Sequence, residues 1–481
     1  MNVNAFDGRR DFLSRSCLAI VLAAGESTRM CSNRPKVLHE LAGRSMLAYV
    51  LSSLKDAGAR QVAVVIGPNH EAVAAEAKRV FCDAEIAVQT ERQGTAHAVL
   101  AARDAIERGY DDLLVVFADT PLVRPTTFIA MRKKLAAGDN AVVVLGFKAR
   151  EPAGYGRLLL EDGGLKAIRE DRDATEAERE ITLCNAGLMG LDGRRALALL
   201  DSIDNANSKK EYYLTDVVAV ARSRGLEIVA EIADEDEVMG VNDRAQLAAA
   251  GAILQNRLRA AAMRGGATLI DPASVTLAFD TALGRDAVIE PHVVFGPGVR
   301  AGEGSRIRSF SYLEGAAIGE GAVIGPFARL RPGTTLAQDV HIGNFVEVKA
   351  SDVSQGAKIN HLSYIGDASI GAKTNVGAGT ITCNYDGMGK YRTEVGENVF
   401  IGSNSALVAP VKIGAGAYVG SGSVITEDVA PGALALGRAR QVEKPGRGKA
   451  LRQAQKEEQG PAIGEPELAS QPAGSNQKDG V

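Results

Sequence analysis

A short polar run near the N-terminus carries residue types that bind phosphate. It reads Leu22-Ala-Ala-Gly-Glu-Ser-Thr-Arg-Met30, and Pro35-Lys36 follows it. A glycine turn lets backbone N–H groups approach a phosphate closely, and the cations Arg29 and Lys36 oppose the phosphate charge. A glycine turn after a strand is weak evidence by itself, because any connection between a strand and a helix can contain one. The length of the run and the spacing to Lys36 favour a triphosphate site.

A second group of reactive side chains lies between residues 326 and 387. Arg331 and Lys349 are 18 residues apart, and two cations on one face could clamp a sugar phosphate. A histidine such as His361, with an intrinsic pKa of about 6.5, can take a proton near neutral pH. An isolated histidine is more often an ordinary surface residue, but the neighbouring Lys349, Tyr364 and Asn384 favour chemistry here.

A six-residue repeat must position this second group. Aliphatic residues recur at every sixth position in two series, Ile318, Ile324, Leu330, Leu336, Ile342 and Val348, and Val395, Ile401, Leu407, Ile413, Val419 and Ile425. Six is neither the helical period nor the strand period, so the series predict a left-handed parallel β-helix in which each hexad forms one side of a triangular coil. Arg331 and Lys349, three hexads apart, should therefore face the same way on successive coils. Residues 377–394 interrupt the repeat and are expected to leave the coil as a loop.

An alternation of strands and helices must position the first group. Apolar runs at 18–23, 61–66, 112–117 and 141–146 predict strands, and an amphipathic pattern at 45–57 predicts a helix. This order is typical of an α/β domain with a mostly parallel, Rossmann-like sheet, whose ligands bind beyond the carboxyl ends of the strands. Ala23-Ala24-Gly25 and Asp119 lie at such ends.

The length of 481 residues and a change of texture near residue 245 predict two domains. An Ala-rich stretch without proline at 244–264 predicts one helix, roughly 30 Å long at 1.5 Å per residue, that connects them. The expected division follows: a disordered extension at 1–17, an α/β domain at 18–244, a linker helix at 245–265, the β-helix at 266–444 and a disordered tail at 445–481.

Composition excludes several function classes. The chain has 55 Lys and Arg against 59 Asp and Glu, and no basic cluster indicates a nucleic-acid partner. Five scattered cysteines without CxxC spacing fit free thiols in a reducing compartment. Residues 1–16 lack the apolar core of a signal peptide, and no apolar stretch has the length of a membrane span. We therefore expect a cytoplasmic protein without membrane insertion.

The first polar run resembles the signature of sugar-1-phosphate nucleotidylyltransferases, and more matches follow it in chain order. They are Gln89, Gln93-Gly94-Thr95, Phe117-Ala118-Asp119, Gly154-Tyr155-Gly156, Glu170, Asn185, Tyr212-Tyr213-Leu214-Thr215-Asp216 and Val241-Asn242. Together they resemble the N-terminal domain of the bifunctional N-acetylglucosamine-1-phosphate uridyltransferase/glucosamine-1-phosphate acetyltransferases of bacteria. Two positions depart from that pattern, Ser27 in place of a second glycine and Phe117-Ala118 in place of Tyr-Gly. We expect local differences in nucleotide contacts there and no loss of activity.

The resemblance implies roles for these residues. UTP would contact Leu22, Ala23, Ala24, Gly25, Arg29 and Lys36, and its uridine would contact Gln89, Gly94 and Thr95. The sugar would contact Gly156, Glu170 and Asn185. Asp119 and Asn242 would bind Mg²⁺, with Asn242 also at the substrate. Any single one of these residues would be unremarkable, and a lone aspartate after a strand is more often a cap or turn residue.

The second half resembles the acetyltransferase domain of the same enzymes. Four stretches carry the resemblance, Pro326–Gly333, Asn344–Lys349, His361–Gly366 and Asn375–Gly387. The family implies that His361 is the general base and that Arg331, Lys349, Tyr364 and Asn375 contact the amino sugar phosphate. It implies that acetyl-CoA contacts Ala378, Asn384, Tyr385, Ser403, Ser421 and Arg438. It also implies a homotrimer whose acetyl-transfer sites form where neighbouring coils meet.

The resulting prediction is a bifunctional enzyme that converts glucosamine-1-phosphate, acetyl-CoA and UTP into UDP-N-acetylglucosamine. The family implies that this product feeds the synthesis of peptidoglycan and, in Gram-negative bacteria, of lipopolysaccharide. One alternative is a nucleotidylyltransferase of single activity with a purely structural coil, and the cluster around His361 counts against it. Another alternative is a non-catalytic subunit, which the presence of Lys36, Asp119 and Asn242 disfavours.

Overall fold

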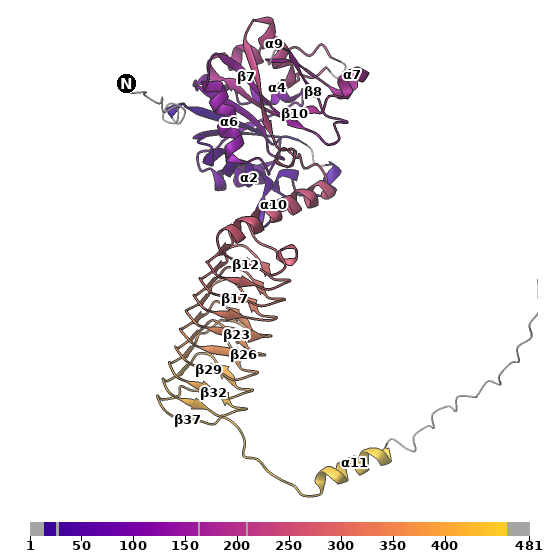
Figure 1. The fold of residues 1–481 in the computed structure, drawn as a ribbon. Helices are drawn as coiled ribbons and strands as arrows, with labels where there is room; N and C mark the ends of the chain where they lie inside the picture. The colour runs from indigo at the N-terminus through magenta and orange to yellow at the C-terminus, as the bar shows by residue number, and fades with distance from the viewer. Residues whose placement is uncertain (1–13, 26–27, 162–163, 208–209, 459–481) are drawn as a thin grey trace, which may run out of the picture.

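The chain folds into an α/β domain and a long coil of short strands, joined by one helix (Figure 1). The structure is a computed structural model, and it describes residues 14–25, 28–161, 164–207 and 210–458. Both predicted fold classes are confirmed, the mostly parallel α/β sheet and the parallel β-helix of hexapeptide repeats. Within the described residues, no helix is both long enough and apolar enough to span a membrane.

The central sheet of the α/β domain has seven strands on its main path. In spatial order they are β11 (Glu227–Ala233), β7 (Asn140–Lys148), β10 (Leu183–Asp192), β6 (Asp112–Phe117), β1 (Cys17–Leu22), β4 (Gln61–Ile66) and β5 (Glu85–Val88). The pairs β1–β4, β1–β6 and β4–β5 are parallel, and β10 runs antiparallel to β6 and β7. Two strands off this path, β8 (Arg157–Glu161) and β9 (Gly164–Arg169), pair with each other, and β8 also pairs with β10.

Helices cover both faces of this sheet, because alternate residues of each strand point to opposite sides. In β1, Ala19 and Val21 belong to one buried cluster, whereas Leu18, Ile20 and Leu22 belong to the other. In the residues that the structure describes, the α-helices are α2 (Met46–Asp56), α3 (Glu71–Val80), α4 (Thr95–Leu100), α5 (Arg103–Glu107), α6 (Pro125–Ala136), α7 (Glu176–Arg179), α8 (Gly193–Leu200), α9 (Val217–Ser223), α10 (Arg244–Arg264) and α11 (Arg447–Glu458).

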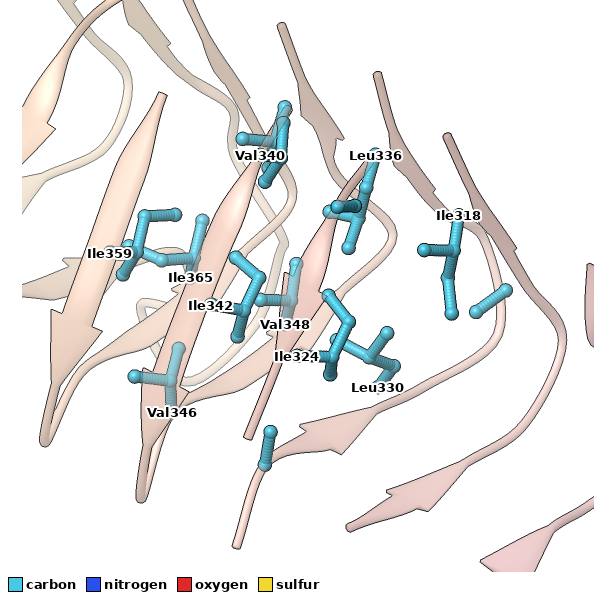
Figure 2. Packing of buried hydrophobic residues seen from close by; sticks show 14 of the residues in the cluster. Ile318, Ile324, Leu330, Leu336, Val340, Ile342, Val346, Val348, Ile359 and Ile365 are labelled. Atoms are coloured by element: carbon cyan, nitrogen blue, oxygen red, sulfur yellow. The ribbon is translucent and has the colours of Figure 1, made fainter. Parts of the chain in front are cut away.

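The coil consists of three parallel sheets of ten, eight and eight strands, which run from β12 (Thr268–Leu269) to β37 (Leu434–Ala435). Each turn of the coil adds one strand to each sheet, so that Ile324 pairs with Ile342, 18 residues later. All twelve residues of the two hexad series are buried in one continuous core. Figure 2 shows the first series, from Ile318 to Val348, inside the coil, where each aliphatic residue packs on its counterparts in the neighbouring turns.

The loop in the coil is shorter than predicted. Residues 381–383 form β30 (Ile381–Cys383), which pairs with β27 (Tyr364–Gly366) and β33 (Ala406–Val408). The inward position six residues after Val376 is Thr382, a fully buried polar residue, so a search for aliphatic residues misses this hexad. Within residues 377–394, the longest stretch outside the strands is residues 384–392, between β30 and β31 (Thr393–Val395), and residues 377–380 form only the short connection before β30.

Each of the two segments predicted to be disordered contains residues that the structure shows as ordered. Strand β1 begins at the buried Cys17, and Arg15 forms an ion pair of 2.6 Å with the buried Asp112, so residues 15–17 belong to the α/β domain. The segment Arg447–Glu458 is the helix α11, because its Ala, Leu, Gln, Lys and Glu residues favour helix even though they do not build a core. Residues 1–13 and 459–481 lie outside the described part of the chain.

The helix α10 packs against both halves of the molecule. Its first turn is capped by Asp243, whose carboxylate accepts a hydrogen bond of 2.8 Å from the Gln246 N–H. Ala250 and Leu254 are buried in a small cluster with residues of the α/β domain, whereas Leu258 and Ala262 pack against the core of the coil. The predicted connector is therefore also part of two hydrophobic cores.

Candidate active sites

A cavity of about 370 Å³ opens at the carboxyl ends of β1 and β6. Nine residues predicted from the sequence line it, namely Leu22, Ala23, Ala24, Gly25, Lys36, Gln89, Gly94, Thr95 and Asp119. Arg92, Phe117, Glu211 and Tyr213 also line it. Arg92 and Glu211 were not singled out in the sequence, although each directly precedes a matched motif. The structure thus brings residues from very different parts of the chain around one volume of nucleotide size.

Charged and amide groups converge at one end of this cavity. The Lys36 Nζ lies 2.5 Å from the Asp119 Oδ2 and 3.1 Å from the Asn242 Oδ1. The Arg29 Nη2 donates to the same Asn242 oxygen at 3.0 Å. Asp119 follows β6, and its backbone oxygen accepts a hydrogen bond of 2.9 Å from Val241, which brings Asn242 beside it. The cations of Arg29 and Lys36 and the side-chain oxygens of Asp119 and Asn242 therefore meet at one point.

The oxygen donors at this point fit a magnesium ion that arrives with phosphates. Mg²⁺ prefers oxygen ligands and usually binds through one or two carboxylates, water and substrate phosphates. Asp119 and Asn242 would supply two such oxygens. In the described parts of the chain, no group of three His, Cys, Asp or Glu residues could hold a metal by itself. Lys36 contacts both oxygens here, so its ammonium would have to move toward the phosphates when a metal binds.

The other end of the cavity is built by the connection before α4. The buried Gln89 donates through Nε2 to the Gly94 carbonyl at 3.3 Å. Gly94 has a φ of +113°, and a Cβ at this position would lie 2.4 Å from the Tyr212 oxygen, so no other residue fits. The Thr95 hydroxyl accepts a hydrogen bond of 2.9 Å from the Leu214 N–H. Amide and backbone groups held this rigidly can recognise the edge of a base.

The three residues predicted to contact a sugar lie at adjacent strands: Gly156 directly precedes β8, Glu170 directly follows β9, and Asn185 lies in β10. The Asn185 N–H donates to the Gly156 oxygen at 2.7 Å, and the pairing of Arg157 with Arg169 places Glu170 beside Gly156. Burial, together with the negative charges of Glu211 and Glu170, raises the pKa of Tyr213. Tyr213 lines the cavity, so the negative charge of Glu170 acts on a residue of the cavity wall.

The Asn185 side chain is fixed by the backbone. Its Oδ1 accepts a hydrogen bond of 2.9 Å from the Gly187 N–H, which directs the amide nitrogen away from that contact. Gly187 in turn packs on Phe117, since a Cβ at Gly187 would lie 2.9 Å from the ring. Phe117, one of the two departures from the family pattern, therefore supports this part of the cavity wall. The other departure, Ser27, lies outside the described residues.

The second candidate site lies on one side of the coil, between two neighbouring corners. Leu330 pairs with Val348, and Lys349 pairs with Gly366, so Arg331 and Lys349 occupy successive turns at the same register, as predicted. Each cation has an acidic neighbour that the sequence did not single out. The Arg331 Nη1 donates to the Glu347 Oε1 at 2.9 Å. The Lys349 Nζ lies 3.8 Å from the Asp367 Oδ2.

His361 ends β26 (Lys358–His361) and is exposed on this side of the coil. It pairs in register with Asn344, the last residue of β23 (His341–Asn344), and its Nδ1 lies 3.0 Å from the Asn344 Oδ1. When the amide oxygen accepts this hydrogen bond, Nδ1 carries the hydrogen and Nε2 presents its lone pair. The arrangement suits a base that acts through Nε2.

The residues predicted to contact a coenzyme form a column beyond His361. The pairings Ile359–Val376, Val376–Ile401 and Ile401–Val419 place the residues two positions later in register on successive turns. These residues are His361, Ala378, Ser403 and Ser421. Asn375 lies in β29 (Asn375–Val376), next to this column, and Arg438 is exposed just after β37.

Tyr364, Asn384 and Tyr385 surround the point where the loop leaves the coil. The Asn384 Nδ2 donates to the Tyr364 hydroxyl at 3.4 Å and to the Asp367 carboxylate. Asn384 is buried, whereas Tyr385 is exposed and its hydroxyl donates to the Gly387 oxygen at 2.7 Å. The residues predicted for acetyl transfer thus occupy two neighbouring corners of the coil on successive turns: His361, Ala378, Ser403 and Ser421 end or follow strands of one sheet, and Arg331 and Lys349 end or follow strands of the next.

Comparison with known proteins covers both halves of the chain. Residues 19–182 match the model of the MobA-like NTP transferase domain, and residues 392–427 match the model of the bacterial transferase hexapeptide. The chain is 62% identical over 440 residues to a protein of Azorhizobium caulinodans, and the aligned region covers 92% of this chain and 98% of the relative. It is 60% identical over 446 residues to one of Xanthobacter autotrophicus, with 93% and 99% covered. Both relatives carry the name "Bifunctional protein GlmU".

Proposed function

The chain belongs to the family of bifunctional GlmU proteins, and on this premise we propose how its two sites share two consecutive reactions. The protein is an enzyme with uridyltransferase and acetyltransferase activities. The side of the coil around His361 carries out acetyl transfer, and the cavity of the α/β domain carries out uridylyl transfer. The product of the first reaction, N-acetylglucosamine-1-phosphate, is the substrate of the second.

Acetyl transfer needs a neutral amine. Glucosamine-1-phosphate carries an ammonium near neutral pH, and this ammonium cannot attack a thioester before it loses a proton. His361 accepts that proton at Nε2, and the amine nitrogen then forms a bond to the acetyl carbon of acetyl-CoA. The bond from that carbon to sulfur breaks, the nitrogen gives up its second proton as the amide forms, and the CoA sulfur takes up a proton to leave as the thiol.

The other residues on this side of the coil hold the two substrates. Arg331 and Lys349 clamp the sugar phosphate, because their cations lie in register on successive turns. Tyr364 and Asn375 contact the amino sugar. The acetyl-CoA contacts are Ala378, Asn384, Tyr385, Ser403, Ser421 and Arg438.

Uridylyl transfer takes place by direct displacement. A phosphate oxygen of N-acetylglucosamine-1-phosphate attacks the α-phosphorus of UTP, and pyrophosphate leaves, so no covalent enzyme intermediate is needed. Lys36 and Arg29 neutralise phosphate charge, and Leu22, Ala23, Ala24 and Gly25 approach the nucleotide through their backbone. Asp119 and Asn242 would hold a Mg²⁺ ion, which supplies further charge neutralisation when bound. Gln89, Gly94 and Thr95 contact the uridine, and Gly156, Glu170 and Asn185 contact the sugar.

An exposed aromatic column supports a homotrimer. The rings of His292, Phe310, Phe327 and Phe345 stack along one corner of the coil, with centroids 5.0 to 5.2 Å apart. The three phenylalanines are between 45% and 55% exposed, and all four residues have φ values of +56° to +61°, which are unfavourable for bulky side chains. An apolar column of this kind is best covered by another protein surface.

This column lies next to the acetyl-transfer residues. Phe345 directly follows Asn344, and the exposed Leu362 directly follows His361. A neighbouring copy that covers the column would therefore also approach His361. We place the enzyme in the cytoplasm, where UTP and acetyl-CoA are available, and its product in the synthesis of peptidoglycan and lipopolysaccharide.

The observation that carries the proposal is the set of polar residues on successive turns around His361. A coil that only mediates assembly has no need for a histidine, two cations in register and a buried Asn384 on neighbouring turns. Two assays on one preparation test the proposal. CoA release should require glucosamine-1-phosphate and acetyl-CoA, and pyrophosphate release should require UTP and N-acetylglucosamine-1-phosphate. Pyrophosphate release without any CoA release would favour the alternative of a structural coil.

A further inference from the structure

One acidic residue of the coil, Asp367, contacts two side chains that are assigned to different substrates of acetyl transfer, Asn384 to acetyl-CoA and Lys349 to the sugar phosphate. We propose that Asp367 is a positioning residue that couples the two subsites: it holds Asn384 in place for acetyl-CoA and restrains Lys349 at the sugar phosphate. The inference rests on the proposed acetyl transfer. The inference also predicts that Asp367 weakens the binding of the sugar phosphate, because its carboxylate is a negative charge near the two cations that hold the phosphate.

The backbone around Asp367 is held from both sides. The residue follows β27 at a corner of the coil and has a φ of +49°, in the left-handed region. Its N–H donates to the Lys349 oxygen at 3.1 Å, and its own oxygen accepts a hydrogen bond of 3.2 Å from the Thr393 N–H. The carboxylate therefore starts from a fixed point between the turn that carries Lys349 and the strand that follows the loop.

The first partner of the carboxylate is the amide of Asn384. This side chain is buried, and its Nδ2 donates to the Asp367 Oδ2 and, at 3.4 Å, to the Tyr364 hydroxyl. The amide lies directly over Gly366, where a Cβ would come within 2.9 Å of Nδ2 and 2.4 Å of the Tyr364 hydroxyl. Without Asp367, a buried N–H of Asn384 would lose its charged acceptor, which is costly. Asn384 would then no longer be held for acetyl-CoA.

The second partner is Lys349, whose Nζ lies 3.8 Å from the same carboxylate oxygen. Both side chains are largely shielded from solvent, with exposed fractions of 20% for Lys349 and 24% for Asp367, so their interaction is less screened than a surface pair. A sugar phosphate that binds Lys349 has to compete with Asp367 for this ammonium. It also brings a second negative charge close to the carboxylate.

Two substitutions separate these two effects. Asp367→Asn removes the charge but keeps an oxygen that can accept from Asn384, and asparagine is tolerated at a positive φ. We expect the KM for glucosamine-1-phosphate to fall roughly two- to fivefold, the upper part of the range for a single partly exposed charge interaction. The KM for acetyl-CoA should change less than twofold. Asp367→Ala removes the acceptor as well, and we expect the KM for acetyl-CoA to rise about tenfold or more.

A matched control tests whether charge anywhere on the coil has the same effect. Asp339 also occupies a coil corner at positive φ, with a value of +56°, and it is exposed. Asp339→Asn should leave both KM values unchanged. Uridylyl transfer should be the same for all variants, because Asp367 lies outside the α/β domain, whereas the melting temperature should fall in Asp367→Ala, where the buried Asn384 N–H loses its acceptor.

The outcomes distinguish the inference from the function on which it rests. Two results together support the coupling role. In Asp367→Ala the KM for acetyl-CoA rises while the KM for glucosamine-1-phosphate falls, and in Asp367→Asn only the KM for glucosamine-1-phosphate falls. Equal effects of the two substitutions, or a sugar phosphate KM that rises in Asp367→Asn, would overturn it. Absence of CoA release in the unsubstituted enzyme would instead refute the proposed acetyl transfer.

Discussion

The two candidate sites are built in different ways. The site in the α/β domain is a cavity whose lining comes from separate connections, including Lys36, Gln89, Asp119 and Tyr213. The site on the coil comes from corners of successive turns and from the loop after β30, and His361, Tyr385, Ser403 and Ser421 are all exposed there. A regular coil can repeat a side chain at one register but cannot easily surround a substrate. The first site is therefore enclosed within one chain, whereas the residues of the second remain open to solvent or, in the proposed homotrimer, to a neighbouring copy.

The difference also concerns how each side chain is fixed. In the cavity, Lys36, Asp119 and Asn242 hold one another through direct contacts across more than 200 residues of sequence. On the coil, position follows from strand pairing, so that Asn344 opposes His361 and Lys349 opposes Gly366. Substitutions at the two sites should therefore affect one reaction each.

The largest effect is expected for Asp119→Ala. Uridylyl transfer should fall below detection, because Asp119 is the only carboxylate within hydrogen-bond distance of Lys36 among the described residues, and it is the strongest proposed Mg²⁺ ligand. Acetyl transfer should not change. Pyrophosphate release with a series of Mg²⁺ concentrations measures the first effect, and CoA release measures the second. A folded variant with substantial uridylyl transfer and an unchanged Mg²⁺ requirement would remove Asp119 from this role.

The next largest effect is expected for His361→Ala. Acetyl transfer should fall by about two to four orders of magnitude, the usual span for a positioned general base, while uridylyl transfer stays intact. His341→Ala is a matched control, since His341 is an exposed histidine on the same sheet of the coil and has no proposed role.

The pH dependence sharpens this prediction. If His361 only removes a proton from the ammonium, raising the pH should partly restore the variant, because more of the amine is then already neutral. If His361 mainly orients the substrate, the defect should persist at every pH. Wild-type rates of acetyl transfer in His361→Ala at pH 7 would refute the assignment and leave the coil as a scaffold.

A smaller effect is expected for Gly94→Ala. The new Cβ would meet the Tyr212 backbone at a φ of +113°, so the connection before α4 has to shift. The KM for UTP should rise roughly ten- to hundredfold, in line with one to three kcal/mol of backbone strain, and acetyl transfer should be unaffected. Gly109→Ala is the matched control, with a φ of +79° and no atom within 4 Å of its Cβ. If both variants behave alike in steady-state kinetics, the fit of Gly94 at Tyr212 plays no part in UTP binding.

Much of this molecule could be predicted from the sequence because periodicity reports burial directly. The hexad series gave the coil, and apolar runs gave β4 and β6 with the bounds that the structure shows. The antiparallel strand β10 was not predicted, since residues 183–192 mix glycine, asparagine and apolar residues without a simple period. The hexad that contains Thr382 was also not predicted, because its inward residue is a threonine and the pattern consists of aliphatic residues.

The acidic partners of the sites could not be predicted from the residues alone. Glu347 and Asp367 become relevant only when strand pairing places them beside Arg331 and Lys349. Asn344 was part of a matched stretch, but its contact with His361 depends on the 17-residue step between those two turns. Contacts of this kind follow from register, and a single sequence does not show which turns have 17 residues and which have 18.

The central claim is that each half of the chain carries one complete reaction of its own, and two overlapping fragments test it most directly. Because α10 packs against both halves, a cut at residue 244 would remove Ala250 and Leu254 from the α/β domain, so both fragments should retain this helix. We predict that residues 1–265 release pyrophosphate but no CoA, and that residues 245–481 release CoA but no pyrophosphate. A folded fragment of residues 1–265 without uridylyl transfer at saturating substrates would contradict the claim.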